Sequence, residues 1–131
     1  MARVLLDSSV LIDLLRGRRG AADRLRLLQS SGDVAVTCAV VIEEVTRGLR
    51  PGEDDDAIAL FEGLDLVPMG MPEGRLAGFW RRSFARRGRT LSQSDCLIAA
   101  TAVGGTASIA TGNPKDFPMK ELHVEHWPVG E

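Results

Sequence analysis

The 131 residues of the chain are enough for one hydrophobic core and too few for two, so we expect residues 1–131 to form a single domain. A hydrophobic fraction of 44% beside 26% charged residues excludes a disordered chain. The net charge of −2, taken alone, argues against a nucleic-acid partner.

Short apolar runs mark the strands, and helical patterns follow the first three of them. The runs predict strands over 4–6, 34–37, 64–67, 108–111 and 122–124. The helical patterns predict helices over 10–15 (capped by Ser8 and Ser9), 21–29, 39–49, 57–62 (behind the acidic run 53–56), from Pro72 onward, and 96–103. The long helix that Pro72 opens should bury one stripe of side chains, made of Leu76, Phe79, Trp80 and Phe84. Strands separated by helices predict an α/β fold, a three-layer α/β/α sandwich around a central, mainly parallel sheet.

The cysteine count and the hydropathy pattern bear on the compartment. Two cysteines are too few for a disulfide scaffold or a zinc cluster. No apolar run reaches the length of a membrane span, and residues 1–7 lead into a strand without the pattern of a signal peptide. We therefore expect a cytoplasmic protein with reduced thiols and no membrane contact.

The near-neutral net charge conceals separated patches. Residues 75–89 hold six arginines and no acid, whereas residues 43–73 hold nine acids and only two arginines. Such asymmetry is more informative than the sum of the charges, and it reopens the question of an anionic partner.

Four acids are predicted to lie at one edge of the sheet. Asp7 follows the first strand directly, Asp116 lies in the loop after the fourth, Glu44 sits about two turns into the helix after the second, and Asp95 stands near a helix N-terminus. Ligands of parallel α/β folds gather at the carboxyl ends of the strands. Taken singly, Asp7 and Asp95 could be helix caps and Glu44 a solvated residue, but four acids at these positions favour a shared site.

Converging carboxylates repel one another and oppose folding unless a cation is present. Mg²⁺ and Mn²⁺ prefer oxygen ligands and need only a few carboxylates. His123 and His126 have no cysteine near them in the sequence, so nothing suits zinc. The sequence therefore predicts a hard divalent cation at this edge.

Four motifs now carry a family resemblance. The segment 5–13 (LLDSSVLID) resembles the opening of PIN-domain ribonucleases, particularly the VapC toxins of bacterial toxin–antitoxin pairs. Glu44-Val45 with Arg47-Gly48 looks like their second motif, and Asp95 followed by an Ile-Ala-Ala helix is close to the third. The segment 111–117 (TGNPKDF) matches the fourth, and Glu125 to Trp127 resembles the usual C-terminal ending. The similarity spans the whole chain in order.

The resemblance implies roles for individual residues. It implies catalytic roles for Asp7, Glu44, Asp95 and Asp116, with Asp7, Asp95 and Asp116 holding Mg²⁺ or Mn²⁺. It also implies polar support of the active site by Ser8, Ser9 and Asn113. Two positions depart from the family pattern: Glu43 replaces a small or apolar residue, and Gly112 stands where an arginine is frequent.

The activity implied is metal-dependent endoribonuclease cleavage by a toxin. A metal-activated water would attack phosphorus, with Glu44 as a ligand or as general base, and leave 5′-phosphate and 3′-hydroxyl ends. Within the segment 75–89, the best candidates for RNA backbone contact are Arg81, Arg82, Arg86, Arg87 and Arg89. Alternatively, these arginines form a solvated face, paired with the acids at 53–56. Trp80 and Phe84 could stack on bases, although their helical spacing favours the core. The implied partners are a transfer or ribosomal RNA substrate, a VapB-type antitoxin and a second copy in a homodimer.

Four alternatives can be weighed against this function. A receiver-like phospho-acceptor domain would need an Asp after the central strand, and the segment 66–70 (LVPMG) offers none. A phosphatase with a nucleophilic Asp-x-Asp is excluded because position 9 is serine. Cys96 beside Asp95 is better explained as a buried thiol than as a nucleophile. A catalytically silent PIN fold that binds RNA or protein stays open.

Overall fold

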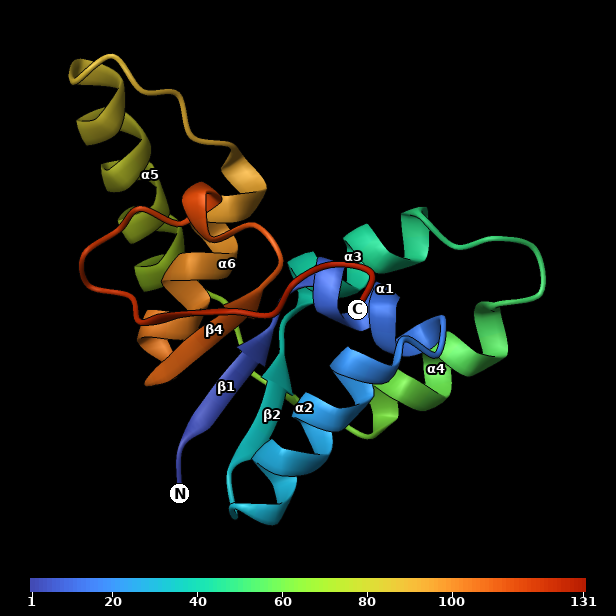
Figure 1. Ribbon diagram of the computed structural model, residues 1–131. Helices are drawn as coiled ribbons and strands as arrows, with labels where there is room; N and C mark the ends of the chain where they lie inside the picture. Colours follow the sequence, from blue (N-terminus) through green and yellow to red (C-terminus); the bar gives the residue numbers. More distant parts are fainter.

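Five short strands form one sheet in which every neighbouring pair runs parallel. The computed structural model describes all residues, 1–131. The strands are β1 (Arg3–Leu6), β2 (Val34–Thr37), β3 (Asp65–Leu66), β4 (Ala107–Thr111) and β5 (Val124–His126). Their order across the sheet is β3-β2-β1-β4-β5, which puts β1 in the centre (Figure 1). All five carboxyl ends therefore point to the same edge.

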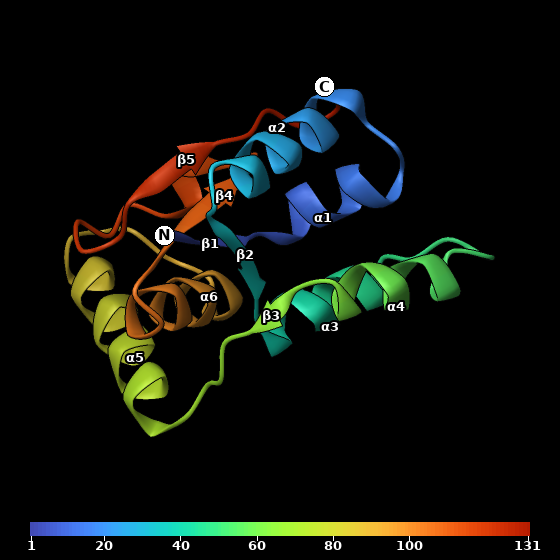
Figure 2. The same cartoon turned by 90° about the horizontal axis from the view of Figure 1, so that it is seen from below.

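Helices cover both faces of this sheet. They are α1 (Ser8–Leu15), α2 (Arg19–Ser30), α3 (Ala39–Arg47), α4 (Asp54–Glu62), α5 (Met71–Arg86) and α6 (Gln93–Gly104), with a 3₁₀ turn η1 (Pro114–Asp116). Figure 2 shows α1 and α2 on one side and α5 and α6 on the other, while α3 and α4 pack beside α1 and project away from the strands. The predicted three-layer α/β/α sandwich is confirmed, and its sheet is wholly parallel. None of the helices is long and apolar enough to span a bilayer.

The centre of the core is β1 and the alanine-rich helix α6. Leu5 and Leu6 are completely buried, as are Cys96 and every residue from Ile98 to Ala102. Small side chains let α6 lie close to the sheet on one side and to α5 on the other. A strand and a helix that are apolar all round are buried on every side, which explains their composition.

The predicted elements differ from the structure in two instructive places. The fifth strand runs over Val124–His126 and not over 122–124, because residues 119–122 form a turn closed by Leu122 N–H and Met119 C=O. The buried stripe of α5 is narrower than predicted, since Trp80 and Ala77 are buried but Phe79 is 53% exposed. As the outermost helix, α5 packs on α6 with one side only, so Phe79 faces outward.

Candidate functional site

Asp7 is a buried carboxylate at the centre of the sheet's carboxyl edge. It directly follows β1, and its backbone N–H donates to the carbonyl of Ala110 on β4 at 3.0 Å. Only 6% of the residue is exposed, and Thr111 Oγ1 donates a hydrogen bond of 2.8 Å to Asp7 Oδ2. Asp7 is the N-cap residue of α1, but its side chain makes no capping hydrogen bond. The alternative that Asp7 serves only as a helix cap therefore does not account for its carboxylate.

The surroundings of Asp7 disfavour its charge. Burial raises the pKa of Asp7 from 3.8 to about 6, and repulsion by Glu44 and Asp95 acts in the same direction. The hydrogen bond from Thr111 lowers the pKa and only partly offsets these effects. No positively charged group offsets the charge of an ionised Asp7 at neutral pH, and a bound cation would do so.

Asp95 continues the acidic group from the other side of the sheet. It lies in the first turn of α6, where Ser92 Oγ, as the helix cap, accepts the Asp95 backbone N–H at 3.1 Å. Burial raises the pKa of Asp95, and repulsion by Asp116 raises it further. Asp95 is half-buried and Asp116 is exposed. The alternative that Asp95 caps α6 is wrong, since Ser92 takes that role.

The four predicted acids are neighbours arranged in a chain. Asp7 repels Glu44 and Asp95, and Asp95 in turn repels Asp116. None of the four forms an ion pair with a lysine or arginine. No three acidic, histidine or cysteine side chains lie close enough together to hold a metal ion in the present arrangement. The four acids thus lie at one edge of the sheet, but they do not surround a single metal position.

The polar residues predicted to support the site have different partners. Ser9 Oγ accepts the backbone N–H of Gly112 at 3.0 Å, and the Asn113 N–H donates to Thr111 Oγ1 at 3.0 Å. The prediction that Ser8 and Ser9 cap the first helix is wrong, because α1 begins at Ser8, two residues before the predicted start, with Asp7 at its N-cap position. Thr111 is the residue that the sequence reading missed. The available signal was a hydroxyl residue directly after the buried pair Ile109-Ala110, at the carboxyl end of β4.

A C-terminal strap, residues 127–131, lies behind the end of β4. The Trp127 N–H donates to the Thr111 carbonyl at 2.9 Å, and the Gly130 N–H donates to Asp13 Oδ2 of α1 at 2.8 Å. Gly112 packs against the side chain of Val129, which occupies the space that a Cβ would need. A larger side chain at position 112 would therefore require the exposed Val129 side chain to shift. The strap joins the Thr111 end of β4 to α1.

Asp13→Ala is expected to loosen this strap. Asp13 is only 7% exposed, and its removal leaves the Gly130 N–H without its acceptor, at a cost of about 1–2 kcal/mol in the free energy of unfolding. Urea unfolding measures this loss, with Asp13→Asn, which keeps an acceptor oxygen, as the matched control. Equal stability of the alanine variant and the wild type would show that Asp13 does not hold the strap.

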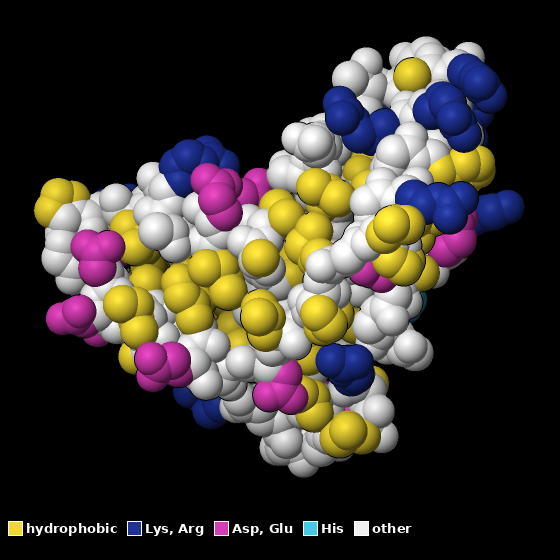
Figure 3. Space-filling view, turned by 180° about the vertical axis from the view of Figure 1, so that it is seen from behind, with side chains coloured by type: hydrophobic (Ala, Val, Ile, Leu, Met, Phe, Trp, Pro, Cys, Tyr) yellow, Lys and Arg dark blue, Asp and Glu magenta, His cyan; other side chains and the backbone are white.

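The predicted RNA-binding arginines gather on and beyond the C-terminal half of α5. The space-filling view in Figure 3 shows lysine and arginine side chains clustered on this projecting arm. Arg81 Nε donates to the Leu91 carbonyl at 3.2 Å, Arg89 donates to the Lys115 carbonyl, and the Arg87 guanidinium lies 4.2 Å from the centre of the Phe84 ring. None of the five predicted arginines is in an ion pair.

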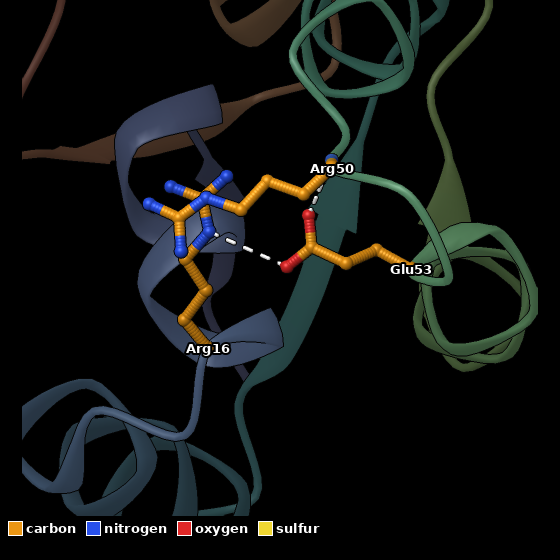
Figure 4. Close-up of polar contacts among 3 residues, drawn as sticks. All are labelled: Arg16, Arg50 and Glu53. Atoms are coloured by element: carbon orange, nitrogen blue, oxygen red, sulfur yellow. Dashed lines mark hydrogen bonds and ion pairs between the residues drawn. The ribbon is translucent and has the colours of Figure 1, made fainter.

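The acidic run 53–56 is engaged elsewhere. Glu53 Oε1 accepts the Arg50 backbone N–H at 2.6 Å, and Arg16 Nε donates to Glu53 Oε2 at 3.4 Å (Figure 4). The first of these contacts is the main cause that lowers the pKa of Glu53, with Arg16 adding to it. The other three acids form the first turn of α4, where the helix dipole favours them. The alternative that the arginines of α5 pair with this run is wrong.

Two further alternatives are decided by burial. Trp80 is 2% exposed and its Nε1–H donates to Glu121 Oε2 at 2.6 Å, so it belongs to the core and cannot stack on a base. Cys96 is completely buried, and burial raises the pKa of its thiol, which makes it a poor nucleophile.

The strand order argues against a receiver domain. The order β3-β2-β1-β4-β5 differs from the receiver order, in which the chain's third strand lies at the centre.

The fold is shared with solved toxin–antitoxin complexes. A VapBC2 complex from Rickettsia felis bound to a promoter DNA fragment matches with a TM-score of 0.81 and 19% identity, covering 95% of this chain and 98% of that chain. VapBC-1 from nontypeable Haemophilus influenzae matches with a TM-score of 0.80 and 22% identity, covering 95% and 98%. At such identities the likeness shows the fold.

The sequence decides the family. Residues 4–118 match the family described as "PIN domain". The chain belongs to the PIN-domain family. Among curated relatives of this PIN domain, Ribonuclease VapC10 of Mycobacterium tuberculosis is 34% identical over 90% of this chain and 88% of its own length. Ribonuclease VapC19 of the same organism is 30% identical over 88% of this chain and 92% of its own length. The predicted resemblance to VapC-type PIN ribonucleases is confirmed.

Proposed function

We propose that residues 1–131 form one nuclease domain that cleaves RNA endonucleolytically with a divalent metal ion, as the toxin of a VapBC-type pair. The main support is the Asp7 carboxylate, which is buried, has a raised pKa, and neighbours two more acids without any basic partner. Two relatives of this chain, VapC10 and VapC19, are named ribonucleases. Cleavage would take place in the cytoplasm, where the RNA is.

The donor set suits a hard divalent cation. Asp7, Asp95 and Asp116 offer only oxygen, which Mg²⁺ and Mn²⁺ prefer, and one or two ions would relieve the repulsion among them. When bound, such an ion lowers the pKa of a water molecule and neutralises the charge of the phosphate. We propose Mg²⁺ or Mn²⁺ for this role.

The residues of the site would then divide the work. Glu44, half-buried on α3, accepts a proton from the attacking water as general base. Thr111 holds the Asp7 carboxylate through its hydroxyl, and Ser9 holds the Gly112 end of the loop that leads to Asn113. Water forms the new bond to phosphorus while the bond to the 3′ oxygen breaks and that oxygen takes a proton. The products carry 5′-phosphate and 3′-hydroxyl ends.

Cleavage of total cellular RNA, with the new ends mapped by sequencing, tests this proposal. We expect cleavage with Mg²⁺ or Mn²⁺, none in EDTA, and ligation-competent 5′-phosphate ends. Cyclic 2′,3′-phosphates would contradict the mechanism because they require the ribose hydroxyl as nucleophile. Equal cleavage by Asp7→Asn would assign the activity to a contaminant. Tight RNA binding without any cleavage would favour the silent-module alternative.

A VapB-type antitoxin and a homodimer are the proposed protein partners. The solved neighbours of this PIN domain include VapBC complexes, and the chain exposes large apolar side chains that a partner could cover. Figure 3 shows hydrophobic side chains running across one face of the molecule. The exposed large apolar residues of the chain include Leu66 of β3 and Met71 of α5, which are 58% and 77% accessible. The proposed substrate is transfer or ribosomal RNA, which the mapped ends would identify.

A further inference from the structure

A pocket of about 370 Å³ lies outside the acidic edge, between α5 and the segment 118–121. Its α5 wall includes Phe79, Phe84 and Arg87, and Lys120 lies on the opposite wall. Phe79 is the aromatic residue that faces outward, with 53% of its surface exposed. The proposed site at Asp7 uses none of these side chains.

The chemistry of this pocket suits an aromatic anion. The Arg87 guanidinium lies over the Phe84 ring at 4.2 Å and is held there without a carboxylate partner. The one acid in the wall, Glu121, already accepts the Trp80 Nε1–H at 2.6 Å. Two cationic side chains beside an exposed ring are what single-stranded nucleic acids meet on their binding proteins, where bases stack and phosphates pair with basic groups.

The chain segment that lines the pocket also leads away from the acidic edge. The segment 118–121 follows η1, which carries Asp116, after the single residue Phe117. Arg89, three residues beyond the end of α5, donates to the Lys115 carbonyl of η1. Figure 1 shows the chain after β4 passing α6 and then running beside α5. The pocket segment therefore begins two residues after Asp116, with the basic groups of Arg89 beside η1 and of Lys120 in the pocket wall.

We propose that this pocket binds one nucleotide of single-stranded RNA, away from the scissile phosphate, with its base on Phe79 and its phosphate on Arg87 and Lys120. The role as a substrate subsite rests on the proposed nuclease function. An RNA duplex keeps its bases stacked inside the helix and gains nothing from Phe79. The subsite therefore selects unpaired segments such as loops.

Fluorescence anisotropy with a short labelled single-stranded oligoribonucleotide in EDTA tests the pocket without cleavage. We expect Phe79→Ala to weaken binding of this probe about tenfold and to leave binding of the matching duplex unchanged. Arg87→Ala should weaken both about fivefold and make the salt dependence shallower by about one ion. The controls are Leu27→Ala and Arg26→Ala on α2, two exposed side chains on the opposite side of the sheet, and both should bind as the wild type does.

The outcomes separate this proposal from the nuclease proposal. Unchanged affinity of both Phe79→Ala and Arg87→Ala, or no binding by the wild type, overturns the subsite even if RNA is cleaved. Unchanged RNA affinity together with a weaker protein partner would assign the pocket to a protein contact and also overturns it. If the wild-type protein and its variants bind RNA as expected but the wild type never cleaves it, the proposed nuclease function is contradicted and the proposed nucleotide-binding pocket is supported. Thermal melts confirm folding, which truncation of an exposed side chain should preserve.

Discussion

Asp7→Asn is expected to stabilise the metal-free PIN domain at neutral pH while it lowers RNA cleavage about a thousandfold or more. The activity is lost because an amide binds a divalent cation weakly and carries no charge. The stability is gained because the variant no longer buries a carboxylate beside Glu44 and Asp95. Unfolding by urea in EDTA and cleavage in Mg²⁺ measure the two effects on the same preparation.

The stabilisation should depend on pH in a defined direction. The pKa of Asp7 is about 6 in the folded protein and 3.8 in its ordinary state. Below pH 3.8 the carboxyl is protonated in both states. As the pH rises toward 6, the unfolded chain loses its proton first, so the folded state becomes less stable by about 3 kcal/mol in all. Above that range the difference stays constant.

Comparison of the two proteins across this pH range isolates the contribution of Asp7. The free energy of unfolding of the wild type should fall relative to Asp7→Asn between about pH 4 and pH 6, and parallel curves would contradict the assignment. Asp95→Asn is the control, since the half-buried Asp95 carboxylate should show the same direction with a smaller amplitude. Millimolar Mg²⁺ should raise the melting temperature of the wild type at neutral pH and leave that of Asp7→Asn unchanged.

Thr111→Val should destabilise the protein by about 2–3 kcal/mol at neutral pH and reduce cleavage about 10- to 100-fold. The substitution keeps the shape of the side chain but removes the donor to Asp7 Oδ2 and the acceptor of the Asn113 N–H. Without that donor the pKa of Asp7 rises further, so the acid limb of the cleavage profile moves to higher pH. Thr111→Ser retains the hydroxyl and should behave nearly as the wild type. If Ser and Val variants had the same profile, Thr111 would be a packing residue only.

Much of the fold follows from local pattern. The run 34–37 was predicted with the bounds that β2 has, because three small or β-branched apolar residues and a threonine follow the turn residues 30–33 and come just before a helical pattern. The burial of α6 follows from its alanines, and the position of Asp7 follows from the first charge after an apolar run. Boundaries that depend on tertiary contacts, such as the start of β5, could not be read in this way.

The outward position of Phe79 shows a second limit of local pattern. A helix buries as wide a stripe as its neighbours cover, and the sequence of α5 does not state that α6 is the main element packed against it. The spacing therefore predicts Phe79, Leu76 and Trp80 as one face. The structure splits that face into core and pocket.

The sequence by itself determined the parallel α/β fold, the PIN family and the arrival of four acids at one edge, because strand ends and motifs are local properties of the chain. Only the tertiary structure decided the raised pKa of Asp7, which burial produces first and neighbouring carboxylates increase. It also showed that Thr111 and Asp13 hold the site in place, through partners that lie 104 and 117 residues away along the chain. Contacts at such separations depend on how the layers pack, and no local pattern records them.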